Sequence, residues 1–238
     1  MIKKSILNVI ATGKYEKYID GIVNSSIKNF LRETELKIIV YTDSKKILKS
    51  NNKNIIPIKI DYESWPYPTL KRFHYFDLAL EHIEKSDYSF YIDVDSFFRK
   101  KIDLKKLGLL DFPGIVGTIH PGFYGSSGTP ETRKESTAYI PENYRFVYHC
   151  GGFFGGNSQN FIHLAKTIKN NIDQDLSKNI IAIWHDESHL NRYFLDYPPI
   201  KSMGKGFSSP EEFLGQEKYK DPYIVFIDKS EDLKNDKK

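Results

Sequence analysis

The chain has little cysteine and no long hydrophobic run, and both absences limit the settings in which it can work. Its one cysteine, Cys150, cannot form an internal disulfide, which favours a reducing compartment. The apolar run from Ile6 to Ala11 is interrupted by Asn8 and is far too short to cross a bilayer. We therefore expect a cytoplasmic protein that has neither a signal peptide nor a transmembrane segment.

The chain also lacks an excess of one charge. Its 35 Lys and Arg residues nearly balance 31 Asp and Glu residues, and the net charge of +4 is spread along the sequence. Such a weak and scattered charge argues against a nucleic-acid partner. The 238 residues, of which 39% are hydrophobic, are enough for a single globular domain with its own core.

The first 95 residues alternate apolar strands with amphipathic helices, which predicts an α/β fold with a mostly parallel sheet. Ligands bind beyond the carboxyl ends of the strands in such sheets, so we expect residues 1–95 to bind a nucleotide. The loop after the first strand lacks the glycine spacing of phosphate-binding motifs, and a diphosphate there would need a metal ion. The expected strands are Ile6–Ile10, Leu36–Tyr41, Ile55–Ile60 and Tyr88–Asp95, and the expected helices are Tyr15–Phe30 and Thr69–Glu84.

Residues 96–228 are richer in glycine and aromatic side chains, and we expect them to form the acceptor and catalytic half of the same domain. A loop rich in Gly, Ser, Thr and Pro is expected from Pro121 to about Glu142. The charged tail, residues 229–238, is expected to be mobile. The expected strands are Phe112–His120, Phe146–Phe154 and Tyr223–Ile227, and the expected helices are Ser158–Asp173 and Trp184–Leu195.

Two aspartates, Asp93 and Asp95, end the fourth expected strand and are separated by Val94. Strand side chains alternate between faces, so both carboxylates point the same way and repel each other unless a cation neutralises them. Hard oxygen ligands suit Mg²⁺ or Mn²⁺, and such ions usually also hold substrate phosphates. A solvated strand end is the alternative that these residues leave open.

The segment from Trp184 to Tyr193 has the sequence WHDESHLNRY and is dense in reactive side chains. His185 and His189 are four residues apart, as in a zinc hydrolase, but Glu187 does not follow the first histidine directly and no third ligand is evident. A carboxylate beside an anomeric carbon can instead stabilise an oxocarbenium-like transition state or attack it. A capped helix with solvated acids is the third interpretation.

Six blocks along the chain resemble the family 6 glycosyltransferases, which include the histo-blood-group A and B transferases and the α-1,3-galactosyltransferases. The blocks occur in the family's order and span almost the whole chain. They are Ala11–Tyr15 (ATGKY), Tyr91–Asp95 (YIDVD), His120–Ser127 (HPGFYGSS), Ala138–Pro141 (AYIP), Gly151–Gly156 (GGFFGG) and Trp184–Tyr193.

The resemblance implies a GT-A fold and a retaining transfer from a UDP-sugar to a galactose-containing glycan acceptor, forming an α-1,3 linkage. Glu187 would be the catalytic carboxylate and would also touch the acceptor. Asp93 and Asp95 would hold Mn²⁺, or Mg²⁺, against the diphosphate. The other implied donor-binding residues are Ile10, Ala11, Thr12, Tyr15, Arg72, Val94, Cys150, Gly151, Gly152, His185, Asp186 and Lys229, and the other implied acceptor-binding residues are His120, Phe123, Thr129 and Trp184.

Departures from the family pattern bear on specificity. Many bacterial relatives carry Asn-x-Asn and need no metal, so the Asp-x-Asp of this chain resembles an unusual bacterial or phage-encoded member. By similarity, Gly152 leaves room for an N-acetyl group and favours UDP-GalNAc over UDP-Gal, although Cys150 matches neither blood-group form. The degraded segment Thr129–Arg133, and Gly215 in place of an acid, alter the acceptor site.

Other classes of function stay open at this level. A non-catalytic module that binds nucleotide sugars or glycans would tolerate the altered acceptor segment. A transferase for a gluco-configured donor, UDP-GlcNAc or UDP-Glc, would share most of the blocks. In Arg72 we expect a donor contact, but an arginine on the surface of a helix is the plain alternative.

Overall fold

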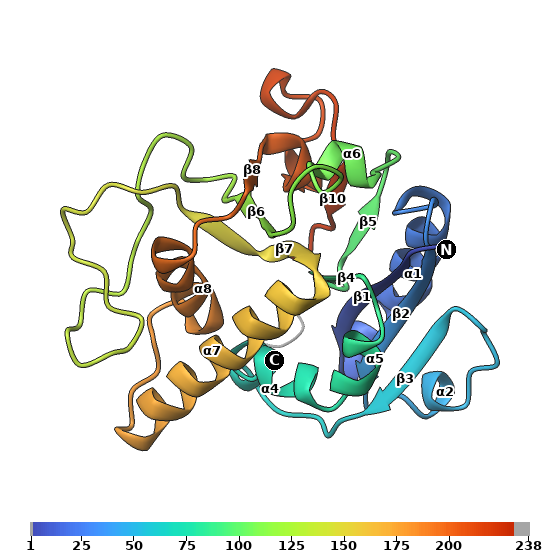
Figure 1. The fold of residues 1–238 in the computed structure, drawn as a ribbon, viewed down its shortest axis with the longest axis horizontal. Helices are drawn as coiled ribbons and strands as arrows, with labels where there is room; N and C mark the ends of the chain where they lie inside the picture. Colours follow the sequence, from blue (N-terminus) through green and yellow to red (C-terminus); the bar gives the residue numbers. More distant parts are fainter. Residues whose placement is uncertain (1, 231–238) are drawn as a thin grey trace.

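A computed structural model describes residues 2–230 (Figure 1). Its centre is a seven-stranded sheet with the order β3-β2-β1-β4-β7-β6-β8. Strands β3, β2, β1 and β4 pair in parallel with one another, and β6 pairs in parallel with β8. Strand β7 lies between β4 and β6 and runs antiparallel to both. The bounds are β1 Lys4–Ala11, β2 Glu35–Thr42, β3 Ile55–Lys59, β4 Tyr88–Ile92, β6 Ile115–Ile119, β7 His149–Asn157 and β8 Lys201–Met203.

Helices cover both faces of the sheet (Figure 1). Strand β1 shows why, because its side chains alternate: Leu7 and Val9 enter a core shared with α1, whereas Ile6 and Ile10 enter a core shared with α4, α7 and α8. The helices are α1 Ile19–Asn29, α2 Lys45–Leu48, α3 Tyr67–Leu70, α4 Arg72–Asp77, α5 Leu80–Glu84, α6 Leu104–Leu107, α7 Ser158–Ser177 and α8 His185–Asp196.

A smaller three-stranded sheet, β5-β10-β9, lies on the α1 side of the large sheet. Its middle strand β10 pairs antiparallel with β5 and parallel with β9, and Ile224 and Val225 are fully buried there. This sheet returns the C-terminal segment to the end of β4. The remaining elements are β5 Ser96–Phe98, β9 Ser209–Pro210, β10 Ile224–Phe226, and the 3₁₀ helices Gly13–Tyr18, Lys205–Phe207, Glu211–Phe213 and Glu217–Tyr219.

The predicted α/β class is confirmed, together with the mostly parallel sheet and a smaller mixed region that together are consistent with a GT-A fold. The predicted helix from Thr69 to Glu84 is wrong as a single element, because it is three short helices with breaks at Lys71 and at Leu78–Ala79. The break places Arg72 in the interior while Lys71 pairs outward with Glu63.

The predicted strand Phe146–Phe154 lies three residues further along, at His149–Asn157. The shift follows from Gly155 and Gly156, which pair with β4 and β6 at the closest approach of the three backbones. Gly155 has a φ of +152°, and a Cβ there would stand 2.5 Å from the Phe90 backbone, so only glycine is accommodated. The helix expected from Tyr15 likewise begins at Ile19, after a 3₁₀ turn from Gly13 to Tyr18.

The tail expected to be mobile starts in a fixed place. Lys229 contacts Asp95, and Ser230 hydrogen-bonds to Asp228. Residues 231–238 lie outside the described part of the chain. Between Ile2 and Ser230, no helix combines the length and the apolar character that a membrane span requires.

Candidate active site

The two predicted metal ligands lie together just past the end of β4. The strand ends at Ile92, and the Asp93 amide then donates a hydrogen bond to the Gly152 carbonyl oxygen (3.0 Å). Asp95 is only 5% exposed, and both its burial and the neighbouring charge of Asp93 raise its pKa. The Lys229 ammonium contacts Asp95 and opposes this shift. The arrangement is a buried carboxylate, Asp95, beside a half-buried one, Asp93, with the Lys229 ammonium already in contact with Asp95.

Arg72 connects this pair to helix α8. Its guanidinium lies 3.3 Å from Asp93 Oδ1 and 3.1 Å from Asp186 Oδ2, and it donates to the Gly151 carbonyl oxygen. Burial by itself would lower the pKa of Arg72, but Asp186, Tyr91 and Asp93 raise it above its ordinary value. Arg72 is only 4% exposed, so the alternative interpretation of it as an arginine on the surface of a helix is wrong.

Glu187 lies in the first turn of α8 and faces the glycine-rich strand β7. Its Oε2 accepts a hydrogen bond from the Gly151 amide (2.8 Å). Burial raises the pKa of Glu187 to about 7, against the lowering effects of the Gly151 amide and the Tyr148 hydroxyl. Burial likewise raises the pKa of the neighbouring Asp186 carboxyl to about 6, and the positive charge of Arg72 limits this rise. Two adjacent carboxyls with strongly shifted pKa values are typical of catalytic sites.

The helix that carries these acids is fixed to β7 by Asn191, which the sequence did not single out. The Asn191 side chain accepts from the His149 amide (2.8 Å) and donates to the His149 carbonyl oxygen (2.8 Å). It also donates to the Glu187 carbonyl oxygen (2.9 Å). Asn191 is 1% exposed, and it substitutes for a β-ladder partner at the start of β7. A polar residue four positions after Glu187, on the apolar face of the helix, was the available signal.

The predicted uridine-binding residues follow the end of β1. Ile10 and Ala11 close the strand, Thr12 follows it, and Tyr15 lies in the next 3₁₀ turn. The Lys229 ammonium stands 5.5 Å from the centre of the Tyr15 ring, so this turn borders the aspartate pair. Tyr62, which sequence reasoning missed, packs against Gly13 in the same turn.

The glycine strand itself contributes backbone more than side chains. Cys150 is buried, with Sγ 3.6 Å from Ser208 Oγ, and Gly151 lies between Arg72 and Glu187. A Cβ on Gly152 would stand 2.7 Å from the Phe226 ring and 3.2 Å from Asp93 Oδ2. Packing therefore gives a reason for this glycine that is separate from donor choice. Val94 points into the hydrophobic core, so only its backbone is available to a ligand.

The predicted acceptor residues surround Tyr148. The rings of His120 and Phe123 pack at 4.6 Å, and both pack against Tyr148. The Tyr148 hydroxyl is buried and makes no hydrogen bond of regular geometry within the described residues. Burial raises its pKa, and so does the neighbouring Glu187 carboxyl. Sequence reasoning missed Tyr148, which joins the predicted acceptor residues to Glu187.

Trp184 forms the outer wall of this region and is 47% exposed. Its indole Nε1 donates to Thr129 Oγ1 (2.6 Å). Glu131, another residue missed from the sequence, is 2% exposed and accepts from the Ile183 amide (2.9 Å) and from Arg133. Burial alone would raise the pKa of Glu131, but the Arg133 hydrogen bonds lower it to about 2. The segment Thr129–Arg133 thus provides a buried acid, Glu131, that holds the backbone next to Trp184 in place.

The two histidines of the segment do not form a zinc site. The His185 ring packs edge-on against Trp65 (4.9 Å), whereas His189 is buried near Asp175 on helix α7. Within the part of the chain that the structure covers, no three His, Cys, Asp or Glu side chains group to hold a metal. The zinc-hydrolase interpretation is therefore wrong for these residues, and the pair Asp93 and Asp95 is left as the candidate cation site.

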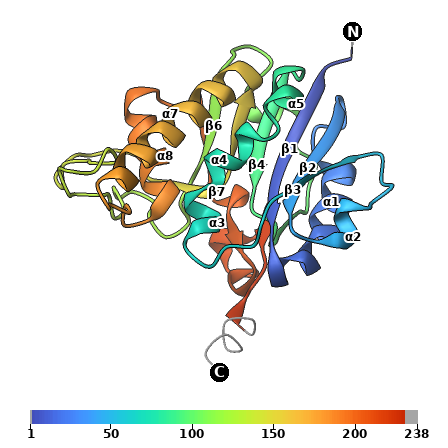
Figure 2. The same ribbon diagram turned by 90° about the horizontal axis from the view of Figure 1, so that it is seen from below.

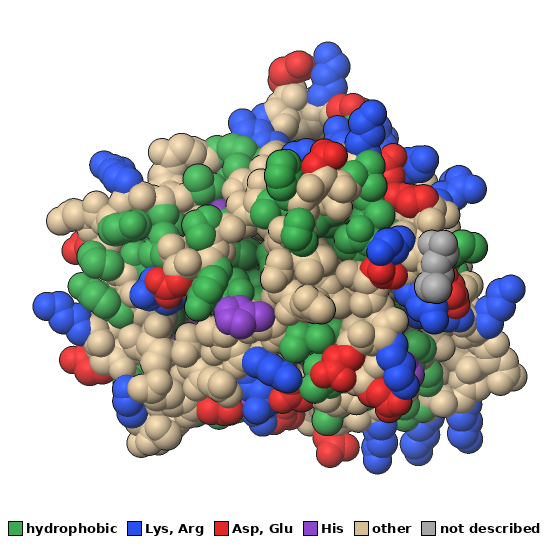
Figure 3. Space-filling view, viewed as in Figure 1, with side chains coloured by type: hydrophobic (Ala, Val, Ile, Leu, Met, Phe, Trp, Pro, Cys, Tyr) green, Lys and Arg blue, Asp and Glu red, His purple; other side chains and the backbone are tan. Residues whose placement is uncertain are grey.

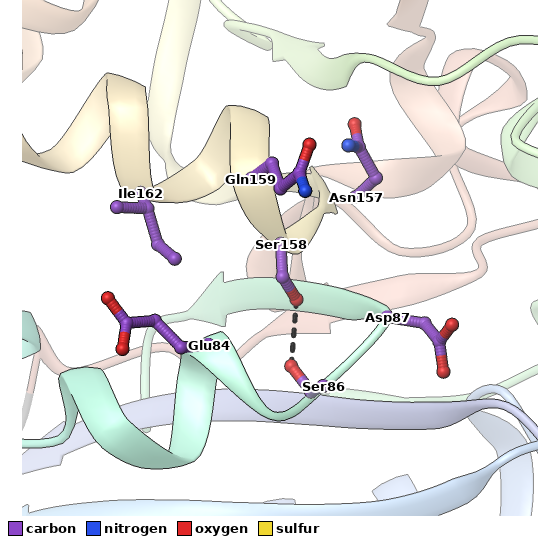
Figure 4. Close-up of a pocket in the computed structure, with 7 residues that line it drawn as sticks. All are labelled: Glu84, Ser86, Asp87, Asn157, Ser158, Gln159 and Ile162. Atoms are coloured by element: carbon purple, nitrogen blue, oxygen red, sulfur yellow. Dashed lines mark hydrogen bonds between the residues drawn. The ribbon is translucent and has the colours of Figure 1, made fainter.

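A separate hollow of about 490 Å³ lies at the other end of β4 (Figure 4). Six of its seven lining residues are polar or charged, the seventh is Ile162, and Ser86 and Ser158 hydrogen-bond across it (2.7 Å). It contains none of the predicted site residues, and it lies where β4 begins rather than where it ends. Figure 2 shows β1 running from the N-terminus down to the edge where the C-terminal segment also lies.

Comparisons with known proteins identify the family of the chain. The model of the family described as glycosyltransferase family 6 matches residues 4–235. An Escherichia coli O-antigen biosynthesis glycosyltransferase is 31% identical over 94% of this chain and 95% of its own length. A rat histo-blood group ABO system transferase is 31% identical over 88% of this chain. A chicken globoside α-1,3-N-acetylgalactosaminyltransferase is 29% identical over 93% of it.

The chain spans 62% of the rat protein and 64% of the chicken protein, so the match covers under two thirds of the length of these vertebrate relatives. The family match extends from β1 to beyond Ser230 and includes every residue assigned to the site above. The chain belongs to glycosyltransferase family 6 and is a hexosyltransferase.

Proposed function

We propose that the protein is a metal-dependent retaining glycosyltransferase that moves GalNAc, or Gal, from a UDP-sugar to a galactoside hydroxyl and forms an α-1,3 linkage. The observation that carries this proposal is the position of Glu187. Its carboxylate is held at the Gly151 amide, at the same end of the sheet as the aspartate pair and Arg72. A sugar that bridges these groups would have its anomeric carbon beside a carboxylate.

The residues of the chain account for the steps of a retaining transfer. The end of β1 and Tyr15 hold the uridine, and Asp186 and His185 orient the sugar. Ionised Glu187 faces the anomeric carbon as the bond to the diphosphate breaks, and it either attacks that carbon or stabilises the cation. Arg72, neutralised by Asp93 and Asp186, keeps the acids apart and fixes their rotamers. Trp184 and His120 place the acceptor hydroxyl.

A divalent cation suits the donor set of this site. Asp93 and Asp95 present hard carboxylate oxygens, and Mg²⁺ or Mn²⁺ is usually held by one or two carboxylates together with substrate phosphates. The buried Asp95 carboxyl already attracts the Lys229 ammonium, which stands in for a cation. When bound, the metal would act as a Lewis acid for the leaving diphosphate.

Donor choice rests on finer support. The chicken relative is named for N-acetylgalactosamine transfer, and Gly152 leaves the backbone bare beside Asp93. We infer UDP-GalNAc as the preferred donor, with UDP-Gal second. Initial rates with UDP-GalNAc, UDP-Gal, UDP-GlcNAc and UDP-Glc test this inference. A higher rate with either gluco-configured sugar would overturn it.

A donor-by-acceptor screen with and without Mn²⁺ tests the function as a whole. We expect product only with galactose-terminated acceptors, loss of activity on chelation, and recovery on addition of Mn²⁺. Release of UDP from the donor in water, without acceptor, separates an enzyme from a binding module, because a module leaves the glycosidic bond intact. Full activity in the presence of a chelator would refute metal dependence and leave transfer itself standing.

A further inference from the structure

An apolar surface lies beside α6, far from the candidate active site. Leu110 and Phe112 belong to the loop between α6 and β6 and are 61% and 69% exposed. Ile200, which is 40% exposed, joins them because its amide donates to the Ile115 carbonyl oxygen (2.8 Å) and its side chain covers Gly114. Three large apolar side chains in one place are more than scattered exposure, and such patches mark interaction sites.

Lysines border this patch. Leu104 and Leu107 turn into the core, so α6 presents Lys105 and Lys106 outward. The Lys201 ammonium donates to the Lys106 carbonyl oxygen (2.8 Å), which brings a third exposed lysine to the same spot. Figure 3 shows Lys and Arg side chains beside hydrophobic ones in the region where Figure 1 places α6. We call Lys105, Lys106, Leu110, Phe112, Ile200 and Lys201 the α6 surface.

We propose that the α6 surface docks on an anionic membrane. Apolar side chains that protrude from a loop can enter the boundary between headgroups and acyl chains, while the flanking lysines bind lipid phosphates. Asp111 lies between Leu110 and Phe112, and the three lysines outnumber it. The chemistry matches a surface that is apolar inside and negative outside.

Two other occupants match less well. A second copy placed on a two-fold axis would set like-charged lysines against each other, which opposes self-association. A nucleic acid would satisfy the lysines but would leave Leu110 and Phe112 without an apolar partner. The patch lies where β6 begins, whereas His120 and the candidate active site lie where β6 ends. Docking therefore leaves the active site open, and the inference stands apart from the proposed function.

Vesicle flotation of the full chain tests the proposal, with vesicles of pure phosphatidylcholine and vesicles containing phosphatidylglycerol. We expect binding to the anionic vesicles that falls as salt is added, and weak binding to the neutral ones. Leu110→Glu with Phe112→Glu, and separately Lys105→Glu with Lys106→Glu, should each lower partitioning by about tenfold or more. Thermal unfolding of each variant shows that the fold is kept.

Matched controls lie elsewhere on the chain. Leu78→Glu changes an apolar side chain of similar exposure, 57%, and Lys45→Glu with Lys49→Glu makes the same charge change on and beside α2. Partitioning of both controls should stay within about twofold of the unmodified chain. Equal losses in controls and test variants would overturn the proposal, as would no binding to anionic vesicles at low salt. A concentration-dependent dimer that Leu110→Glu with Phe112→Glu dissociates, without vesicle binding, would assign the surface to a second copy instead.

Discussion

Replacing Glu187 by Gln should stabilise the protein at alkaline pH while it removes transfer activity. In the folded protein burial raises the pKa of this carboxyl to about 7, from an ordinary value of 4.5. Each pKa unit corresponds to about 1.4 kcal/mol, so ionising Glu187 costs the folded state about 3 kcal/mol. The amide oxygen of glutamine can still accept from Gly151, and the variant does not carry this cost.

The sign of the pH dependence follows from proton binding. Between pH 4.5 and about 7 the folded chain binds a proton at Glu187 that the unfolded chain has largely released, so stability falls as pH rises through this window. At pH 4 the unmodified protein and the variant differ little on this account. By pH 8 the variant should gain about 3 kcal/mol of unfolding free energy relative to the unmodified protein.

Urea unfolding of both proteins at pH 5 and pH 8 measures this difference, and UDP binding by calorimetry shows that the donor pocket is kept. Transfer should fall by about 10³-fold or more if Glu187 meets the anomeric carbon. Glu142→Gln, at an exposed position outside the candidate site, is the control that makes the same chemical change. The reasoning fails if the difference in unfolding free energy between Glu187→Gln and the unmodified protein is the same at pH 5 and pH 8. The catalytic role fails if transfer stays near normal.

Three other substitutions test the parts around this acid. Asn191→Ala removes the hydrogen bonds to His149 and leaves the buried N–H and C=O of that residue without partners. The free energy of unfolding, measured in urea, should therefore fall by about 2 to 5 kcal/mol. An unchanged value would show that water replaces the Asn191 amide. Lys229→Ala should tighten Mn²⁺ binding in the absence of UDP, measured by paramagnetic resonance of the free ion, because it removes the ammonium that contacts Asp95. The same variant should bind UDP more weakly in calorimetry. Weaker Mn²⁺ binding would contradict the idea that the ammonium stands in for the metal. Glu131→Gln should lower the free energy of unfolding by roughly 2 kcal/mol, because it weakens the hydrogen bonds that hold Ile183 and Arg133. It should raise the acceptor KM more than it lowers kcat, because Trp184 is then held less firmly. An unchanged KM would show that Glu131 does not position Trp184 for the acceptor.

The parts of the fold that the sequence predicts well are encoded locally. Strands β1, β2 and β4 are largely buried on both faces, so each appears as a mostly apolar run, and parallel order follows from the helices between them. Of the small sheet, the sequence predicts only β10, as the strand Tyr223–Ile227. Strands β5 and β9 are three and two residues long, carry no usable periodicity, and are defined by their pairing with β10.

The site divides along the same line. Asp93, Asp95, Asp186 and Glu187 stand out because acids follow an apolar strand or open a helix. Tyr148 and Asn191 did not stand out, since a tyrosine in an aromatic stretch and an asparagine in a helix each have commoner explanations. Their roles arise from contacts that only the fold brings about, such as the ladder that Asn191 makes with His149.

The same long-range contacts explain why the catalytic end is built around charge rather than apolar packing. Arg72, at 4% exposure, is surrounded by Asp93, Asp186 and Glu187, and a buried cation with three acids costs stability unless each charge is paired. Asp93 and Asp186 pair with the guanidinium directly, which leaves the charge of Glu187 without a fixed partner. A positive charge that develops on a bound sugar can supply that partner. In the proposed reaction, Glu187 would be destabilised before the donor binds and best stabilised at the point of reaction, which is what differential binding of a transition state requires.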